Sequence, residues 1–404
     1  MRTKYWLCAS VFLTSLALAA SASAQKHYSP GVSDTEIILG QTMPYSGPAS
    51  SYGTIGRAEA AYFAMINDHG GVNGRKIKLI SLDDGYSPPK TVEQTRRLVE
   101  QEHVLLDYSP LGTPTNSSIQ KYLNEQKVPQ LLVATGATKW GDPEHFHWTM
   151  GWQPTYQTEG HIYAKYLLET KPNAKIGILY QNDDYGKDYV KGLKDGLGAK
   201  AATMIVKEVT YETTDPTIDS QIVSLQGSGA DVFYYVTIPK FAAQAIRKAH
   251  DIGWKPLQLL NSVSNSVGSV LTPAGLEASK DILTVEYAKD PTDPSWKDDP
   301  AMKDWLAWMS KYFPDGDKND LFNVYGYNQA ATMVQILKQC GDDLTRENVM
   351  KQAANLKNFS PPLLLPGIRI NTSPTDYFPI KQEQLARFDG KTWVLFGNVL
   401  AMSN

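Results

Sequence analysis

The feature that most constrains this chain is an alternation of short apolar segments with amphipathic, helix-like segments. In the first part, strands are predicted at 37–39, 76–82, 104–106 and 131–133, and helices at 56–68, 88–101 and 116–125. After Met150 the alternation restarts, with helices at 156–169, 185–197 and 241–252, a strand at 176–180, and further segments at 202–209, 218–226 and 232–236. Unbroken apolar strands such as Ile176–Leu179 are typical of a parallel sheet covered on both faces. The sequence therefore predicts an α/β fold with two doubly wound parallel-sheet lobes in tandem.

The remainder of the chain departs from this alternation. The 404 residues exceed the size at which one core usually stops growing, so two domains are expected. Helices are predicted at 303–313, 322–339 and 346–356. The end of the chain indicates a β-hairpin, with strands at 384–388 and 393–399 on either side of Asp389-Gly390.

The first 24 residues have the pattern of a cleavable secretory signal peptide. Arg2 and Lys4 precede an apolar run at 6–20, and Ala22-Ser23-Ala24 supplies small residues for cleavage. The run is shorter than the roughly 20 residues that cross a bilayer, which disfavours a membrane anchor. Cys8 lies at the start of the run, where no anchoring cleavage could follow it, which disfavours a lipoprotein. We expect cleavage after Ala24 and a periplasmic location.

The net charge and the cysteine content argue against nucleic-acid binding and against chemistry at a cysteine. The net charge is −3, and removal of Arg2 and Lys4 takes it to −5, so nucleic acid is not expected as a partner. Cys340 is then the only thiol, and it follows the apolar stretch 333–337. An internal disulfide is impossible, and we interpret Cys340 as a buried, inert thiol rather than a nucleophile.

Motifs that carry catalysis or hold cofactors are missing from the sequence. There is no G-x-x-x-x-G-K-[ST] loop, no G-x-G-x-x-G at the first helix and no G-x-S-x-G turn. His145 and His147 have no third metal ligand at a recognisable spacing. Asp83-Asp84 and Asp183-Asp184 follow predicted strands and could hold a metal, but capping of the next turn or helix is the favoured interpretation. The sequence predicts no catalytic residue, no metal site and no cofactor.

Three polar turns follow predicted strands of the first lobe. They are 43–48, with Tyr52 just beyond it, 109–115, and 134–138. Such turns offer backbone N–H groups and hydroxyls, and in open α/β sheets they lie at the carboxyl edge, where ligands bind. With Trp152, Tyr156 and Tyr185 opposite them, they indicate a cleft for a small carboxylate.

The same residues resemble a known family. Thr42–Pro48 with Tyr52-Gly53, and then Ile66–Arg75, look like the start of the leucine/isoleucine/valine-type periplasmic binding proteins of ABC importers. Asp83-Asp84, Val128-Pro129 and Asp184–Gly186 fall where that family places similar residues. The resemblance extends from about Ser33 to Asn404.

The resemblance implies two lobes joined by three hinge crossings, with the ligand buried between the lobes. We expect the crossings near 150–152, 284–286 and 366–369. After the signal peptide at 1–24, lobe I would comprise 25–150 plus 286–366, and lobe II 151–285 plus 367–404. Partners would be a small carboxylate ligand and the permease subunits of an ABC transporter in the inner membrane, and the protein is expected to be a monomer.

The resemblance also implies roles for individual residues. Tyr52 would cover the ligand from the first lobe, Thr113 and the 134–136 turn would hold its carboxylate, and Tyr185 would close over it from the second lobe. The full predicted ligand-binding set is Tyr45, Tyr52, Gly112, Thr113, Ala134, Thr135, Gly136, Trp152, Tyr156, Tyr185, Ser262 and Asn265.

One departure from the family bears on the ligand. Amino-acid-binding members usually place a Glu after the strand at 258–260, where it pairs with the ligand's ammonium, but this chain has Asn261–Asn265 without an acid. A buried ammonium without a counter-charge costs several kcal/mol, out of about −8 kcal/mol for a ~micromolar ligand. Either another acid substitutes, such as Glu159 or Asp183, or the ligand has no amine. We favour a small organic or aromatic carboxylate that stacks on Trp152 and the tyrosines.

The sequence leaves alternative functions open. A sensor subunit that presents its ligand to a membrane receptor would use the same closing cleft as the binding component of an importer. An exported enzyme is less favoured, because the turn sequences offer neither a nucleophile with its base nor a metal cluster.

Overall fold

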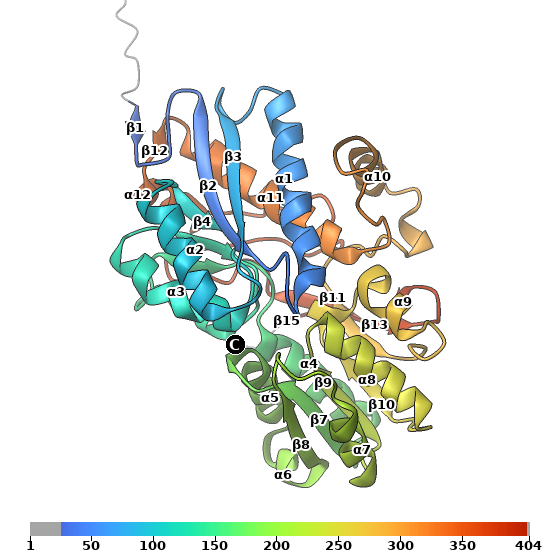
Figure 1. The fold of residues 1–404 in the computed structure, drawn as a ribbon. Helices are drawn as coiled ribbons and strands as arrows, with labels where there is room; N and C mark the ends of the chain where they lie inside the picture. Colours follow the sequence, from blue (N-terminus) through green and yellow to red (C-terminus); the bar gives the residue numbers. More distant parts are fainter. Residues whose placement is uncertain (1–25, 402–404) are drawn as a thin grey trace, which may run out of the picture.

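Two lobes, each built on a largely parallel sheet, pack against one another in the computed structural model, which describes residues 26–401 (Figure 1). The predicted signal peptide and its cleavage site lie outside the described residues. Helices cover the sheets of both lobes, as expected for strands whose two faces are both apolar. This arrangement confirms the predicted α/β fold class.

The sheet of lobe I has the strand order β3-β2-β4-β5-β6, and all its pairs are parallel. Its strands are β2 (Glu36–Met43), β3 (Lys76–Asp83), β4 (Leu106–Tyr108), β5 (Gln130–Val133) and β6 (Thr149–Gly151). The helices between them are α1 (Gly53–Asp68), α2 (Pro88–Glu100) and α3 (Thr113–Glu125). A short additional pair joins β1 (His27–Tyr28) to β12 (Asp343–Leu344).

The sheet of lobe II has the order β14-β13-β11-β10-β9-β7-β8. Its parallel strands are β7 (Ile176–Gln181), β8 (Ile205–Tyr211), β9 (Val232–Val236), β10 (Leu257–Leu260) and β11 (Leu283–Glu286). The main helices of this lobe are α4 (Tyr156–Thr170), α5 (Asp184–Leu197), α7 (Asp219–Gly227) and α8 (Pro239–Asp251), with the short α6 (Ala201–Met204) and α9 (Thr272–Ala274). The predicted hairpin forms as β13 (Gln382–Phe388) and β14 (Trp393–Leu395), and β13 extends the sheet antiparallel to β11, with β15 (Leu400–Ala401) paired at its start.

The C-terminal helices belong to lobe I. They are α10 (Pro300–Tyr312), α11 (Leu321–Cys340) and α12 (Arg346–Ala353), and α11 packs along α1. Close approach is possible because Gly326 of α11 faces α1, where a Cβ would lie 2.7 Å from the carbonyl oxygen of Ile55. The apolar side chains of these helices share one core with the first sheet.

The chain passes between the lobes three times, and the lobe in which each residue is buried shows where it does so. Trp152 packs in the core of lobe I and Tyr156 in that of lobe II, and the chain returns to lobe I between Val285 and Tyr287. The third passage comes later than the predicted 366–369. Ile368, Ile370, Tyr377 and Ile380 are buried in the lobe I core, so the chain leaves that lobe only between Ile380 and β13.

Contacts across the cleft hold the lobes close together. The Tyr52 hydroxyl donates to the carbonyl oxygen of Val263 at 2.9 Å. Asp320, which caps the start of α11, accepts hydrogen bonds across the cleft from the hydroxyls of Ser266, at 2.7 Å, and Ser269. The structure therefore describes a closed form.

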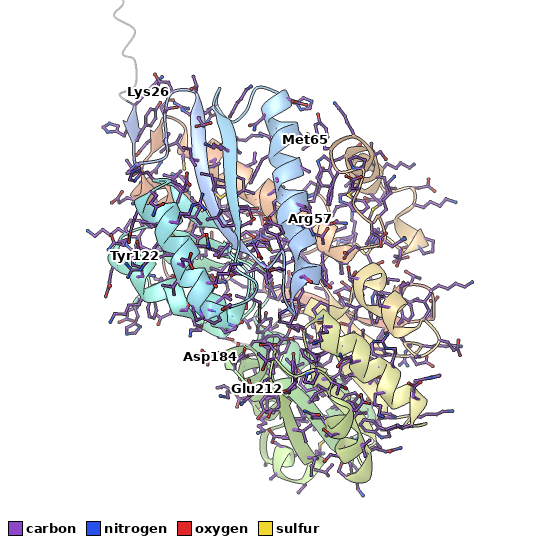
Figure 2. All side chains as sticks on the ribbon, in the orientation of Figure 1. Lys26, Arg57, Met65, Tyr122, Asp184 and Glu212 are labelled. Carbon is purple, nitrogen blue, oxygen red and sulfur yellow. The ribbon has the colours of Figure 1, made fainter. Side chains whose placement is uncertain are left out.

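A second group of interlobe contacts lies beside α5. The backbone N–H of Thr138 donates to Asp188 Oδ2 at 2.7 Å, and Lys139 pairs with Asp184 at 3.1 Å. Asp184 is labelled at the junction of the lobes in Figure 2. The Lys139–Asp184 pair is largely exposed, and pairs of this kind stabilise a protein by at most about 1 kcal/mol.

Within residues 26–401, no helix combines the length and apolarity needed to cross a membrane.

Candidate functional site

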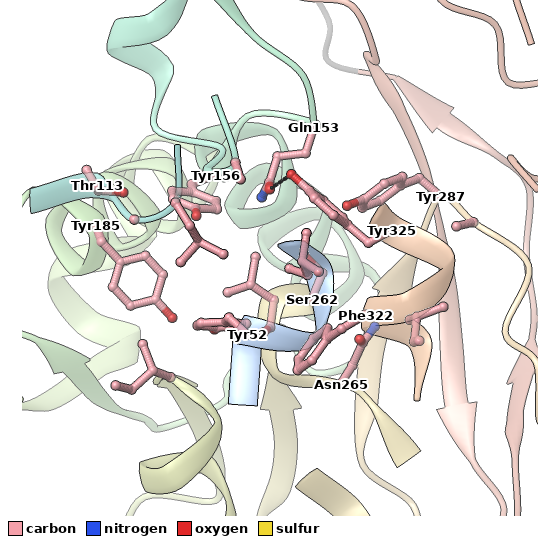
Figure 3. Close-up of a pocket in the computed structure, with 18 of the residues that line it drawn as sticks. Tyr52, Thr113, Gln153, Tyr156, Tyr185, Ser262, Asn265, Tyr287, Phe322 and Tyr325 are labelled. Carbon is pink, nitrogen blue, oxygen red and sulfur yellow. Dashed lines mark hydrogen bonds between the residues drawn. The ribbon is translucent and has the colours of Figure 1, made fainter. Parts of the chain in front are cut away.

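A cavity lies between the two lobes, where side chains from both fill the junction (Figures 2 and 3). The empty space among its lining atoms, including the part open to solvent, is about 710 Å³. Its lining residues are Tyr52, Ile55, Tyr86, Leu111, Gly112, Thr113, Ala134, Gln153, Tyr156, Tyr185, Ile238, Ser262, Val263, Asn265, Glu286, Tyr287, Ala288, Leu321, Phe322 and Tyr325. Several come from the first residues of α3, α4, α5 and α11, so these helix N-termini meet at the cavity.

Six tyrosines line the cavity, and several of their hydroxyls are hydrogen-bonded within the protein. Tyr325 donates to Gln153 Oε1 at 3.0 Å (Figure 3), and Tyr185 accepts from Asn261 Nδ2 at 2.7 Å. Burial raises the pKa of Tyr156 and Tyr185, so these phenols stay neutral. The rings therefore offer mainly apolar surface to a ligand.

One end of the cavity has the features of an anion site. α3 begins there, and its N-cap residue Gly112 (φ 98°) supplies no side chain to cap the free amides of the first turn. A Cβ at Gly112 would lie 2.5 Å from the ring of Tyr86, so only glycine fits. The Thr113 hydroxyl lies 2.6 Å from that of Thr135, which lies 3.0 Å from the Tyr156 hydroxyl. Amides, a helix dipole and a chain of hydroxyls are what a carboxylate prefers.

An acid lies in another part of the cavity lining. Glu286 ends β11 and is buried, and its Oε1 accepts a hydrogen bond from Asn265 Nδ2 at 2.8 Å. Desolvation, with repulsion from Asp290, raises the pKa of Glu286 well above its usual range. Sequence reasoning missed Glu286, although it placed one of the lobe crossings at 284–286. An acid at the end of a strand that enters the cleft was the signal that could have identified it.

Comparison with known proteins assigns the family. Residues 36–392 match the model of a family described as periplasmic binding protein. The chain belongs to this family. A relative from Brucella suis, Leu/Ile/Val-binding protein homolog 1, is 24% identical over 336 residues, which cover 80% of this chain and 84% of the relative.

Solved periplasmic binding proteins have the same fold. A branched-chain amino acid ABC transporter protein from Thermus thermophilus, solved with bound valine, has a TM-score of 0.82 at 16% identity and covers 92% of this chain and 98% of its own. A fatty acid ABC transporter substrate-binding protein from Thermomonospora curvata has a TM-score of 0.75 at 22% identity and covers 93% and 95%. The first protein was solved with valine and the second belongs to a fatty acid transporter, so the shared fold does not assign a ligand here.

Eight of the twelve predicted site residues of this periplasmic binding protein line the cavity. They are Tyr52, Gly112, Thr113, Ala134, Tyr156, Tyr185, Ser262 and Asn265. They come from both lobes, although their part in binding stays a prediction.

The other four predicted residues lie behind the cavity wall or away from it. Tyr45 is turned away, with its hydroxyl 2.6 Å from Ser81 Oγ. Trp152 is fully buried, donates to Thr332 Oγ1 at 3.0 Å and packs edge-on against Tyr325. It therefore supports a lining ring and does not present its own face to the cavity.

Thr135 and Gly136 lie directly behind the lining. Thr135 links Thr113 to Tyr156 through hydroxyls. A Cβ at Gly136 would lie 2.4 Å from the carbonyl oxygen of Pro154 and 2.7 Å from the ring of Tyr156, so glycine allows that ring to pack here.

Neither of the two acids proposed as ammonium partners lines the cavity. Glu159 accepts hydrogen bonds from the Ser262 amide at 2.9 Å, from the Ser262 hydroxyl at 2.7 Å and from Tyr189 at 2.9 Å. Burial raises the pKa of Glu159 to about 7. Asp183 caps α5 by accepting from the amides of Tyr185 and Gly186.

The remaining candidate groups have local partners. Asp84 accepts from the Tyr86 amide at 2.9 Å, and His145 lies 2.9 Å from Asp142 at the surface. Among the described residues, no cluster of three His, Cys, Asp or Glu side chains could hold a metal ion. Cys340 is buried, which raises the pKa of its thiol to about 12.

Proposed function

We propose that this chain is the solute-binding component of an ABC importer, and that it traps a small carboxylate between its lobes. The observation that carries the proposal is the cavity lined from both lobes, with the uncapped start of α3 and the Thr113 hydroxyl at one end. None of the described lining residues is Lys or Arg, so neutral donors would hold the carboxylate.

The mechanism follows from the position of the cavity. A ligand touches both lobes only when they are closed, so the difference in its affinity for the two forms drives closure. The described lining residues include no His or Cys, and no residue is assigned a catalytic role. The closed surface would be recognised by permease subunits in the inner membrane.

The location and the assembly complete the proposal. Removal of residues 1–24 would release the protein into the periplasm. The name of its family, periplasmic binding protein, supports this location. We expect the mature chain to act as a monomer, as its resemblance to the periplasmic binding proteins implies.

A thermal-shift screen of the mature protein tests the proposal. A ligand at 100 times its Kd adds about 2.7 kcal/mol to the free energy of unfolding, which raises the melting temperature measurably. Aliphatic and aromatic carboxylates are compared with their primary amides, which have the same shape but no charge. Stabilisation by a carboxylate and not by its amide is expected. Stabilisation by the amides, or by cations without a carboxylate, would contradict the proposal.

A further inference from the structure

The polar groups of the cavity lie in two separate places. Thr113 lies at one side of the cavity in Figure 3 and Asn265 at the opposite side, with Tyr52, Tyr156 and Tyr325 between them. Glu286 belongs to the Asn265 side, because the two are hydrogen-bonded. A ligand that fills the cavity therefore meets donors at one end and an acid at the other.

The Glu286 end offers acceptors for a donor. Glu286 and Asn265 both line the cavity, and Asn265 Oδ1 is buried without a hydrogen-bond partner among the described residues. An unpaired buried acceptor costs about 1–3 kcal/mol. A ligand N–H or O–H placed here could donate to Asn265 Oδ1, an acceptor that the described residues leave unsatisfied, and to the Glu286 carboxyl group beside it.

The same end does not suit a carboxylate. Desolvation, together with the neighbouring buried acids Asp290, Glu159 and Glu383, raises the pKa of Glu286, so a negative charge is already unfavourable here. A ligand carboxylate would bring a further negative charge to this group of acids, and the described lining has no Lys or Arg to compensate it. The carboxylate of the ligand therefore belongs at the Thr113 end, which fixes the orientation.

An α-amino acid does not fit a cavity that receives a carboxylate at one end and a hydrogen-bond donor at the other. Its ammonium is bonded to the carbon next to the carboxylate, so it would lie near Thr113. The lining there has no acid: Glu159 is bonded to Ser262 and Tyr189, and Asp183 caps α5. The ammonium would be buried without a counter-charge.

We infer that the ligand carries a hydrogen-bond donor, an amine or a hydroxyl, separated from its carboxylate by an apolar body, and that Glu286 with Asn265 receives this donor. The inference rests on the proposed function, since it takes the Thr113 end as the carboxylate site. It specifies the ligand class as ω-substituted acids in place of α-amino acids.

Two sets of matched compounds test the inference by calorimetry with the mature protein. The aliphatic set is hexanoate, 6-aminohexanoate and norleucine, and the aromatic set is 3-phenylpropanoate, 3-(4-aminophenyl)propanoate and phenylalanine. In each set the two amines are isomers that differ only in where the nitrogen lies. We expect the isomer with the remote amine to bind at least ~10-fold tighter than both other members of one set, which corresponds to about 1.4 kcal/mol.

Two variants test whether Glu286 causes the preference for the isomer with the remote amine. Glu286→Ala should reduce the ~10-fold preference to less than about 3-fold. Glu125→Ala, which removes an exposed carboxylate from α3, should leave the preference unchanged. If Glu286→Ala does not fold, the ranking of the isomers by the unaltered protein decides alone.

The outcomes separate the inference from the proposed function. Tightest binding of norleucine or phenylalanine, equal binding within both sets, or an unchanged preference in Glu286→Ala would overturn the inference, while carboxylate binding itself would stand. Failure of all six carboxylates to bind would contradict the proposed function and the inference with it.

Discussion

We assign the Thr113 hydroxyl as the side-chain donor to the ligand's carboxylate, so Thr113→Val is the most informative substitution. The side chain is 1% exposed and lines the cavity, and valine has nearly the same shape. A hydrogen bond to a charged group contributes about 1.5–3 kcal/mol. Its loss should weaken carboxylate binding by about 10- to 150-fold.

The hydroxyl chain behind Thr113 predicts a graded series. Tyr156 can donate to Thr135, and Thr135 to Thr113, which leaves the Thr113 proton for the ligand. Thr135→Val interrupts this chain one step further back and should weaken binding by a smaller factor than Thr113→Val. Thr113→Val loses one hydrogen bond within the protein and Thr135→Val loses three, each at a cost of about 1 kcal/mol in the free energy of unfolding.

A buried threonine elsewhere provides the control. Thr95 of α2 is fully buried, and its Oγ1 has no hydrogen-bond partner among the described residues. Thr95→Val should leave ligand affinity unchanged and keep or raise the stability, because a methyl group suits the site better. Calorimetric titration with the tightest-binding carboxylate measures all three variants. Affinity of Thr113→Val within about twofold of the unaltered protein would refute the assignment of this hydroxyl.

Three further substitutions test the protonation of a buried acid in lobe I and the closure and shape of the site. The acid is Glu59 of α1, which lies outside the cavity lining and accepts hydrogen bonds from the hydroxyls of Tyr108 and Ser109. Burial raises the pKa of Glu59 to about 8 from 4.5, so its contribution to stability is complete below about pH 4.5 and is lost as the pH rises towards 8. In urea unfolding, Glu59→Gln should remove up to about 1.4 kcal/mol per pH unit of that decline, and an identical slope in the variant would contradict this. Asp320→Ala removes the interlobe bond to Ser266 and should increase the radius of gyration in X-ray scattering, whereas an unchanged value would exclude a role in closure. Gly136→Ala should displace the ring of Tyr156 and lower both melting temperature and affinity, and unaltered affinity would mean that this wall does not shape the site.

Much of the fold could be predicted from the sequence because its signals are local. The predicted helix at 156–169 and strand at 176–180 match α4 and β7 to within one residue at each end, since apolar periodicity records which face is buried. β11, at 283–286, lies in the predicted crossing and was not identified as a strand, because its pairing with β10 and β13 is long-range. The third crossing depends on packing too: nothing local shows that Tyr377 and Ile380 return to the lobe I core.

The site was predictable where it follows from strand-end turns. Thr113 and Tyr185 lie at the first turns of α3 and α5, which the strand-to-helix alternation had already placed at the edge of a sheet. Trp152 and Tyr45 were expected to face the ligand, but whether an aromatic ring points into a cavity or into the core is decided by neighbours distant in sequence, such as Thr332 for Trp152. The position of Glu286 beside Asn265 has the same long-range origin.

A crystal structure of the protein with the tightest-binding carboxylate would show which groups hold the ligand. We expect a ligand enclosed by both lobes, with a carboxylate oxygen about 2.7–3.0 Å from Thr113 Oγ1 and from an amide of the first turn of α3. A carboxylate lying beside Glu286, or a ligand bound outside the space between the lobes, would contradict this expectation.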